Sequence, residues 1–247
     1  MFRFTRSAVM VAALAAAPVA ARAQESGSGF LFGAPAGSFT LRGGWALARA
    51  HSDLFSFTTR ELTLNRGDFS SPELAADLAF RVRSRTEIVL SSSVSKVGKG
   101  SEFRDFIDNN NLPIQQNTQF ERVPVTLGVK QYLRSTGRSI GTFAWIPAAV
   151  APYVGAGAGV MWYRFHQDGD FIDFQTTKVF HDIYDSSGWT KTAHAMAGVD
   201  FSLGPRFALT TDARYVWSSA PLSQDFSGFQ RLDLSGFSTT VGLAVRF

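Results

Sequence analysis

The sequence predicts an all-β fold, an eight-stranded antiparallel up-and-down transmembrane β-barrel with long external loops. Three observations support it: eight segments in which apolar and polar side chains alternate, connections that alternate between short and long, and a C-terminal segment that ends on Phe247. A period of two is typical of a β-strand with one apolar face. An even number of strands lets a single chain close into a barrel whose first and last strands pair.

The clearest alternation lies in residues 233–247. Its apolar face is formed by Phe237, Thr239, Val241, Leu243, Val245 and Phe247. A strand of this length can cross a bilayer, because a tilted spanning strand needs about nine to eleven residues. This ending resembles that of outer-membrane β-barrel proteins of Gram-negative bacteria, in which the barrel-assembly machinery reads a terminal Phe. The resemblance makes Phe247 the expected assembly signal and that machinery an expected partner.

Seven further segments alternate in the same way. They are residues 37–48, 73–83, 86–94, 122–133, 151–163, 191–203 and 206–217. In the Gly-rich segment 151–163 the inward face is ambiguous. The chain has no charge between residues 141 and 163, which would also suit a membrane helix. However, Pro147, Pro152 and the glycines around Gly157 interrupt helices, so we predict a strand here.

The N-terminus predicts export. Arg3 and Arg6 precede an apolar run, and residues 21–23 read Ala-Arg-Ala, the A-x-A pattern of a cleavage site. The apolar run is shorter than the roughly twenty residues that a spanning helix needs. We therefore expect a signal peptide at 1–23, a flexible lead-in at 24–36 and a barrel domain at 37–247, located in a bacterial outer membrane.

Composition narrows the chemistry. The chain has no cysteine, so disulfides and thiolate mechanisms are excluded. Its formal charge of +4 falls to about +1 once Arg3, Arg6 and Arg22 leave with the signal peptide, which gives no general electrostatic support for a nucleic-acid partner. The Gly-Ala repeat at 155–159 lies inside a strand and is not a nucleotide-binding loop. No cofactor is expected.

Alternation alone would also describe a soluble lipocalin-like barrel, so the connections must decide. Short turns at 84–85 and 204–205 alternate with long segments at 49–72, 98–121, 165–190 and 219–232, as in outer-membrane barrels. The link at 135–147 is the exception, because it is long where a short turn is expected.

Aromatic residues near both ends of the predicted strands predict two belts at the lipid headgroups. They are Phe39, Phe80, Tyr132, Tyr153, Phe201, Phe207 and Phe247 at one end, and Trp162, Tyr163, Tyr215 and Trp217 at the other.

The polar strand faces are expected to line the barrel interior. Eight strands leave an interior that side chains roughly fill, and an unpaired charge out of water costs several kcal/mol. We therefore predict a lumen charge network of Arg42, Asp77, Arg81, Glu87, Lys130, Asp200, Asp212, Arg214 and Arg246, with Tyr132 and His194 as further polar lumen residues. The bases outnumber the acids, which leaves open a narrow polar passage.

The long loops are acidic. Residues 49–73, 98–121, 165–190 and 219–233 hold seven bases and fifteen acids. They would form an ordinary solvated surface, meet the divalent ions of lipopolysaccharide, or repel anions at the mouth. Asp168, Asp170 and Asp173 could share a calcium ion, but they lack the twelve-residue calcium-loop pattern, so we expect surface acids and no metal site.

Together these features predict a non-enzymatic protein, either a narrow porin-like channel for small solutes or a structural protein of the envelope. The pattern and strand number resemble the OmpW-like family, which is associated with passage of hydrophobic compounds. Two alternatives stay open: loop-mediated adhesion or recognition, and a lipid A-modifying enzyme using His194 with Ser218 or Ser219. Expected partners are outer-membrane lipid and lipopolysaccharide and a small solute.

Overall fold

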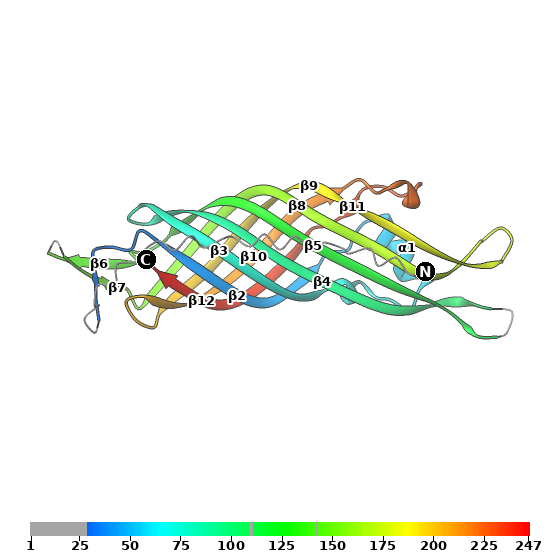
Figure 1. Cartoon of the computed structure of the whole chain (residues 1–247), viewed down its shortest axis with the longest axis horizontal. Coiled ribbons are helices and arrows are strands. Elements are labelled where there is room, and N and C mark those ends of the chain that lie inside the picture. The colour runs from blue at the N-terminus through cyan, green and yellow to red at the C-terminus, as the bar shows by residue number, and fades with distance from the viewer. Residues whose placement is uncertain (1–28, 109–110, 142) are drawn as a thin grey trace, which may run out of the picture.

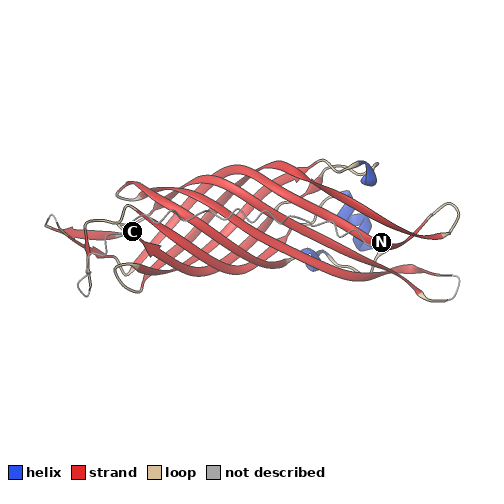
Figure 2. Cartoon of the chain, in the orientation of Figure 1, coloured by secondary structure: helices blue, strands red, loops and turns tan. Residues whose placement is uncertain are grey.

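The computed structural model describes residues 29–108, 111–141 and 143–247, so the expected signal peptide lies outside the described residues. Its main sheet closes into a barrel (Figures 1 and 2). Eight strands of the described part form the ring, in the order β2 (Gly37–Ala48), β3 (Ser71–Arg83), β4 (Thr86–Ile107), β5 (Pro113–Tyr132), β8 (Val150–Ile172), β9 (Val179–Ser202), β10 (Phe207–Ala220) and β12 (Gly236–Arg246). All neighbours are antiparallel, and β12 pairs with β2 to close the ring, which confirms the predicted fold class.

The link at residues 135–147 is a small folded sheet at the end with the short turns. Strands β6 (Gly137–Ile140) and β7 (Ala144–Pro147) form a hairpin, and β1 (Leu31–Phe32) pairs with β7. The end of the expected lead-in is therefore held by backbone pairing. The connection is long because it builds this second sheet.

Two hairpins extend far beyond the rest of the barrel (Figure 1). Strands β4 and β5 have 22 and 20 residues, and β8 and β9 have 23 and 24. The sequence predicted only the membrane portions of these strands. Outward side chains beyond the lipid need not be apolar, so the period of two fades there while the backbone ladder continues.

The first long loop contains α1 (Asp53–Glu61) and η1 (Arg66–Phe69), and the last contains η2 (Gln224–Phe226) and β11 (Leu232–Asp233). Asp53 in the first turn of α1 and Arg60 in the last complement the helix dipole. Leu54, Phe55 and Thr58 share the buried side of α1. No helix among the described residues is long and apolar enough to span a membrane.

The strands place apolar side chains outside and polar ones inside. Leu41 is 54% exposed and Leu127 is 59% exposed, whereas Arg42, the neighbour of Leu41 along the strand, is 2% exposed. Adjacent strands keep this order, since Leu41 lies beside Leu243 and Leu243 beside Leu209. An apolar wall around a polar interior is the arrangement of a membrane barrel, not of a soluble one.

The predicted aromatic belts are only partly correct. Exposed rings do lie at both ends, Phe39, Phe80, Phe201, Phe207 and Phe247 near the short turns and Trp217 near the long loops. Tyr132, Tyr153 and Tyr163 instead point inward and are nearly fully buried. Their hydroxyl groups explain the difference, because each finds a hydrogen-bond partner inside the barrel.

The Gly-rich strand β8 makes room for large lumen side chains. A Cβ on Gly155 would lie 2.5 Å from the Cε of Met196, and one on Gly157 would lie 2.6 Å from the Cε1 of His194. Both distances are too short for real contacts, so these positions accept only glycine without rearrangement. The small residues of this strand thus allow close approach of neighbouring side chains inside the barrel.

Phe247 sits at the seam that closes the barrel. Its backbone N–H donates to the oxygen of Gly37 at 3.0 Å, and its carbonyl accepts from the N–H of Ala36 at 2.7 Å. Its ring lies outside, edge-on to that of Phe80. Its role as an assembly signal stays a prediction.

The outward face allows a direct stability test. Val241 lies in the middle of β12 and faces outward, so Val241→Arg should destabilise the folded protein in lipid by about 2–4 kcal/mol, because a cation at mid-bilayer is poorly solvated. Leu203→Arg, in the short turn after β9, is the control and should cost only about 0–1 kcal/mol. Urea unfolding in vesicles measures both. Equal costs at the two positions would contradict the membrane placement.

Candidate functional site

A four-residue charge cluster lies at the centre of the lumen. The guanidinium of Arg42 lies 2.8 Å from an oxygen of Asp212 and also bonds Asp77. Its Nη1 donates to the hydroxyl of Thr240 at 3.0 Å. Arg214 approaches the same two carboxylates, at 3.3 Å from Asp212 and 3.9 Å from Asp77. Strands β2, β3 and β10 therefore meet across the bore through two arginines and two aspartates.

A second cluster lies toward the short turns and is organised by Asp200. Its carboxylate accepts from the Lys130 ammonium at 3.0 Å, the Tyr132 hydroxyl at 2.6 Å and the Thr210 hydroxyl at 2.9 Å. Glu87 lies 3.4 Å from the same Tyr132 hydroxyl. This cluster draws on β4, β5, β9 and β10, so it also reaches across the barrel.

Tyr153 connects the two clusters. Its hydroxyl donates to Asp212 in the first, at 3.0 Å, and the Lys130 ammonium of the second lies 3.8 Å from the centre of its ring. A cation over an aromatic face is attracted by the ring quadrupole. The sequence placed Tyr153 in an aromatic belt and so missed this link.

Arg81 and Arg246 were predicted in the network, but no ion pair joins them to a carboxylate of the described residues. Arg246 donates to the Ser202 hydroxyl at 2.9 Å, and Arg81 lies 3.4 Å from the Thr136 hydroxyl. Both guanidinium groups face the ring of Trp145, at 5.8 and 5.7 Å from its centre. They form a cation–aromatic layer at the short-turn end, which depends on the unforeseen strand β7.

Two further charged lumen residues were missed. Glu73 was assigned to an external loop and Arg122 was left out of the network, yet both line a small cavity together with His194 and Arg214. Arg122 is 6% exposed and its Nη1 donates to the carbonyl of Leu234 at 3.1 Å. The alternation of the sequence could have identified Arg122 as a lumen residue, because it lies on the same strand face as Lys130. Glu73 adjoins the loop, where the face is hard to assign.

This cavity is roomy enough for water. It offers about 30 Å³ to the centres of water molecules, and one water needs about 10–15 Å³. The Nε2 of His194 is buried beside it and has no hydrogen-bond partner among the described residues. The cavity lies between the central charge cluster and the external mouth, and its lining includes the charged side chains of Glu73, Arg122 and Arg214.

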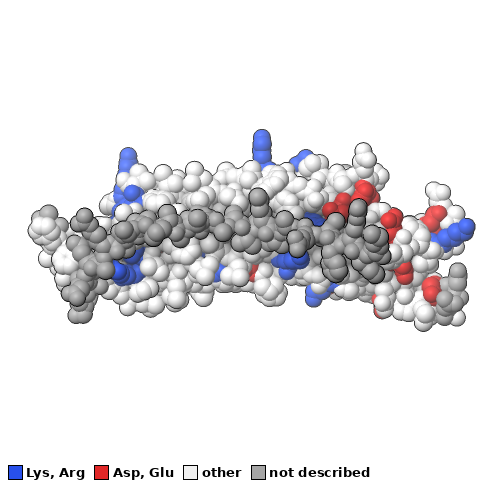
Figure 3. All heavy atoms as spheres, viewed as in Figure 1, with Lys and Arg blue, Asp and Glu red and all other residues white. Residues whose placement is uncertain are grey.

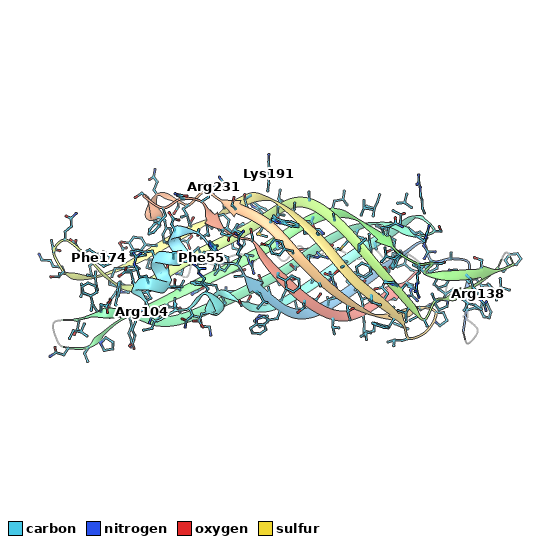
Figure 4. All side chains as sticks on the ribbon, turned by 180° about the vertical axis from the view of Figure 1, so that it is seen from behind. Phe55, Arg104, Arg138, Phe174, Lys191 and Arg231 are labelled. Carbon is cyan, nitrogen blue, oxygen red and sulfur yellow. The ribbon has the colours of Figure 1, made fainter. Side chains whose placement is uncertain are left out.

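An aromatic cluster closes the external mouth. Phe55 of α1 is fully buried, and its ring centre lies 4.6 Å from that of Phe69, 5.4 Å from Phe120 and 5.7 Å from Phe165. Phe226 of η2 packs against Phe165 at 5.6 Å. The pairs meet edge to face, which is a favourable arrangement of aromatic rings. Figure 4 labels Phe55 at this end of the barrel. Helix α1 thus acts as a plug within the ring of strands.

In the enzyme alternative His194 would act with Ser218 or Ser219, and both serine hydroxyls hydrogen-bond to other groups. His194 lies in the lumen, whereas the Ser218 hydroxyl donates to the carbonyl of Lys191 at 3.0 Å. The Ser219 hydroxyl accepts from Arg231 at 3.1 Å. Neither serine hydroxyl is hydrogen-bonded to His194.

The external acids also separate. Asp168 and Asp170 lie 3.6 and 3.1 Å from the imidazole of His181, whereas Asp173 accepts from its own turn. The hydrogen bond from the Thr176 hydroxyl, aided by the Gln175 N–H, lowers the pKa of Asp173 below its ordinary value. The described residues contain no group of three metal-ligating side chains placed to hold an ion. Figure 3 shows acidic side chains gathered at the long-hairpin end.

No protein-family model matches the sequence, and no curated protein matches it either. Similar solved structures include the outer-membrane protein OprG from Pseudomonas aeruginosa, with 16% identity, a TM-score of 0.45 and coverage of 87% of this chain and 98% of that one. Neisserial surface protein A shows 12% identity, a TM-score of 0.45 and coverage of 85% and 99%. The outer-membrane protease OmpT from Escherichia coli shows 10% identity, a TM-score of 0.32 and coverage of 85% and 94%. The barrel architecture of this chain rests on its own closed strand ladder and its apolar outer wall.

The central cluster predicts a strong effect of Arg42→Met. The variant removes the cation that pairs with both Asp77 and Asp212, so two buried carboxylates lose a neutralising partner. This loss should lower the free energy of unfolding by about 3–5 kcal/mol. Adding Asp212→Asn should recover part of that loss, because it removes one uncompensated charge. Arg138→Met, at an exposed site, should change stability by less than about 0.5 kcal/mol. Equal stability of the Arg42→Met and Arg138→Met proteins in urea would contradict the cluster's role.

Proposed function

We propose that the protein is a non-enzymatic outer-membrane barrel with a structural role in the envelope, and that its bore is closed at rest. The observation that carries this proposal is the filling of the lumen at three depths. The aromatic cluster around Phe55 closes the mouth, the Arg42 cluster closes the centre, and the layer of Arg81, Trp145 and Arg246 lies at the short-turn end. An open porin keeps a continuous aqueous channel instead.

Passage of a small solute would require at least the plug to move. Helix α1 belongs to a loop and is not part of the strand ladder, and its Asp53 carboxylate accepts from the backbone N–H of Gln230 at 2.8 Å in the last loop. A polar contact between two loops is easier to break than a closed ladder. A porin-like role therefore requires a gated channel, in which α1 moves out of the mouth. Recognition by the long hairpins stays a prediction.

Single-channel recording in planar bilayers tests the closed bore. Wild-type protein should show no steady conductance steps, because both the mouth and the centre are filled. The triple variant Phe55→Ala/Arg42→Ala/Trp145→Ala should conduct, since it removes one filling side chain at each of the three depths. Phe143→Ala, which removes an exposed ring in the connection between β6 and β7, is the matched control and should stay silent.

Folding of each variant is checked first by circular dichroism and by its heat-dependent mobility on gels. Steady conductance of the wild-type protein would overturn the proposal in favour of an open channel. Silence of a correctly folded triple variant would show that these three side chains do not close the bore.

A further inference from the structure

Three cations form a row on the outer wall of the barrel, at the end with the long loops. In the ladder between β9 and β10, Thr192 pairs with Ser218, and both side chains are buried in the lumen. Successive side chains of a strand alternate between faces, so the next residues, Lys191 and Ser219, face outward. Arg231 lies over Ser219, with its Nη2 2.7 Å from the Ser219 carbonyl. Figure 4 shows Lys191 projecting away from the wall, and labels Arg231 nearby.

Arg49 extends the row across the closing seam. It follows β2 directly, its backbone N–H donates to Ser235 after β11, and its side chain is 53% exposed. A shallow hollow of about 750 Å³ lies along this part of the wall. It is lined by Arg49, Trp189, Lys191, Trp217, Arg231 and Asp233, among others.

This patch has a surplus of positive charge. Among the described residues, neither Lys191 nor Arg231 forms an ion pair, and Arg231 donates only to the neutral oxygens of Ser219. The one acid in the row, Asp233, lies 3.9 Å from Arg49 and also accepts the backbone N–H of Ser235 at 3.0 Å. The long loops are acidic as a whole, so a cationic patch here runs against the surrounding charge.

Two exposed tryptophans fix the depth of the patch. Trp217 is 50% exposed and lies two positions from Ser219 toward the barrel centre, while Trp189 is 63% exposed and lies two positions from Lys191 on the other side. Tryptophans on a barrel wall mark the level of the lipid headgroups. The cations between them therefore lie where the headgroup phosphates of the outer leaflet lie.

We propose that this patch, defined by Arg49, Lys191 and Arg231 with Trp189 and Trp217, binds the phosphate groups of an anionic glycolipid in the outer leaflet. Arginine presents a planar fork of N–H donors that suits phosphate, and lysine adds a compact charge. The tryptophan rings offer amphipathic surfaces to the sugar and to the upper acyl chain. A soluble acidic polysaccharide would carry similar charge, but the patch faces sideways into the bilayer, which favours a lipid.

The test compares two lipids on the full-length protein in detergent. Tryptophan fluorescence is titrated with diphosphorylated lipid A and with the same lipid after removal of its phosphates. The wild-type protein should bind the phosphorylated lipid about tenfold tighter or more, because each cation near an anionic headgroup adds attraction. Equal affinity for the two lipids would overturn the proposal.

The variant Arg49→Gln/Lys191→Gln/Arg231→Gln should lose this preference while keeping its heat-dependent mobility on gels. The matched control is Arg66→Gln/Arg83→Gln/Arg138→Gln, which removes the same charge at exposed sites elsewhere and should keep the preference. Retention of the preference by the patch variant would overturn the assignment.

Two soluble competitors separate the sources of anionic groups. Inorganic phosphate should displace the phosphorylated lipid only weakly, because it lacks the sugar and acyl contacts. If inorganic phosphate matched the lipid in affinity, the patch would be a free-phosphate site. If heparin bound more tightly than the lipid, the patch would serve a polysaccharide. Either result overturns binding of a lipid.

Discussion

The whole structure depends on one constraint: inside a bilayer, every backbone N–H and carbonyl must find a partner within the chain. A sheet meets that demand only by closing, and here closure is the pairing of β12 with β2 from Gly236–Ala48 to Arg246–Ser38. Phe247 continues the seam by bonding Gly37. Once the ring is closed, each strand has one lipid face and one lumen face. The alternation of the sequence then decides what the interior contains.

Closure also forces the interior to be filled. Eight strands enclose too little space for a wide channel, so large side chains must interdigitate or be matched by small ones. His194 and Met196 fit because glycines of β8 lie against them. The charged groups fit because Arg42 satisfies two carboxylates at once and Asp200 accepts three donors. The same demand for filling explains the aromatic plug, in which Phe55 of α1 packs against Phe120 and Phe165 of the strands.

The sequence predicted the part of the fold that lipid enforces. Leu41, Leu127 and Leu243 face outward as their spacing required, because an apolar solvent makes period two obligatory. The long hairpins were underestimated because water on both faces removes that signal. Phe55 could not be placed, since the nine residues of α1 are short and their packing depends on Phe120 and Phe165, more than sixty residues away.

The candidate site shows the same limit. The sequence predicts which charged side chains point inward. It does not predict which of them come into contact, because that depends on the register between neighbouring strands, and the alternation within one strand carries no information on register. Arg42 reaches Asp212 across the seam, whereas Arg246 reaches Trp145 on an unforeseen strand.

The arginines of the barrel differ according to whether their side chains point into the lumen or toward the membrane. An inward one such as Arg42 is satisfied by carboxylates of the chain itself. An outward one such as Arg231, at the headgroup level, hydrogen-bonds only neutral oxygens among the described residues, so its charge is left for the membrane to neutralise.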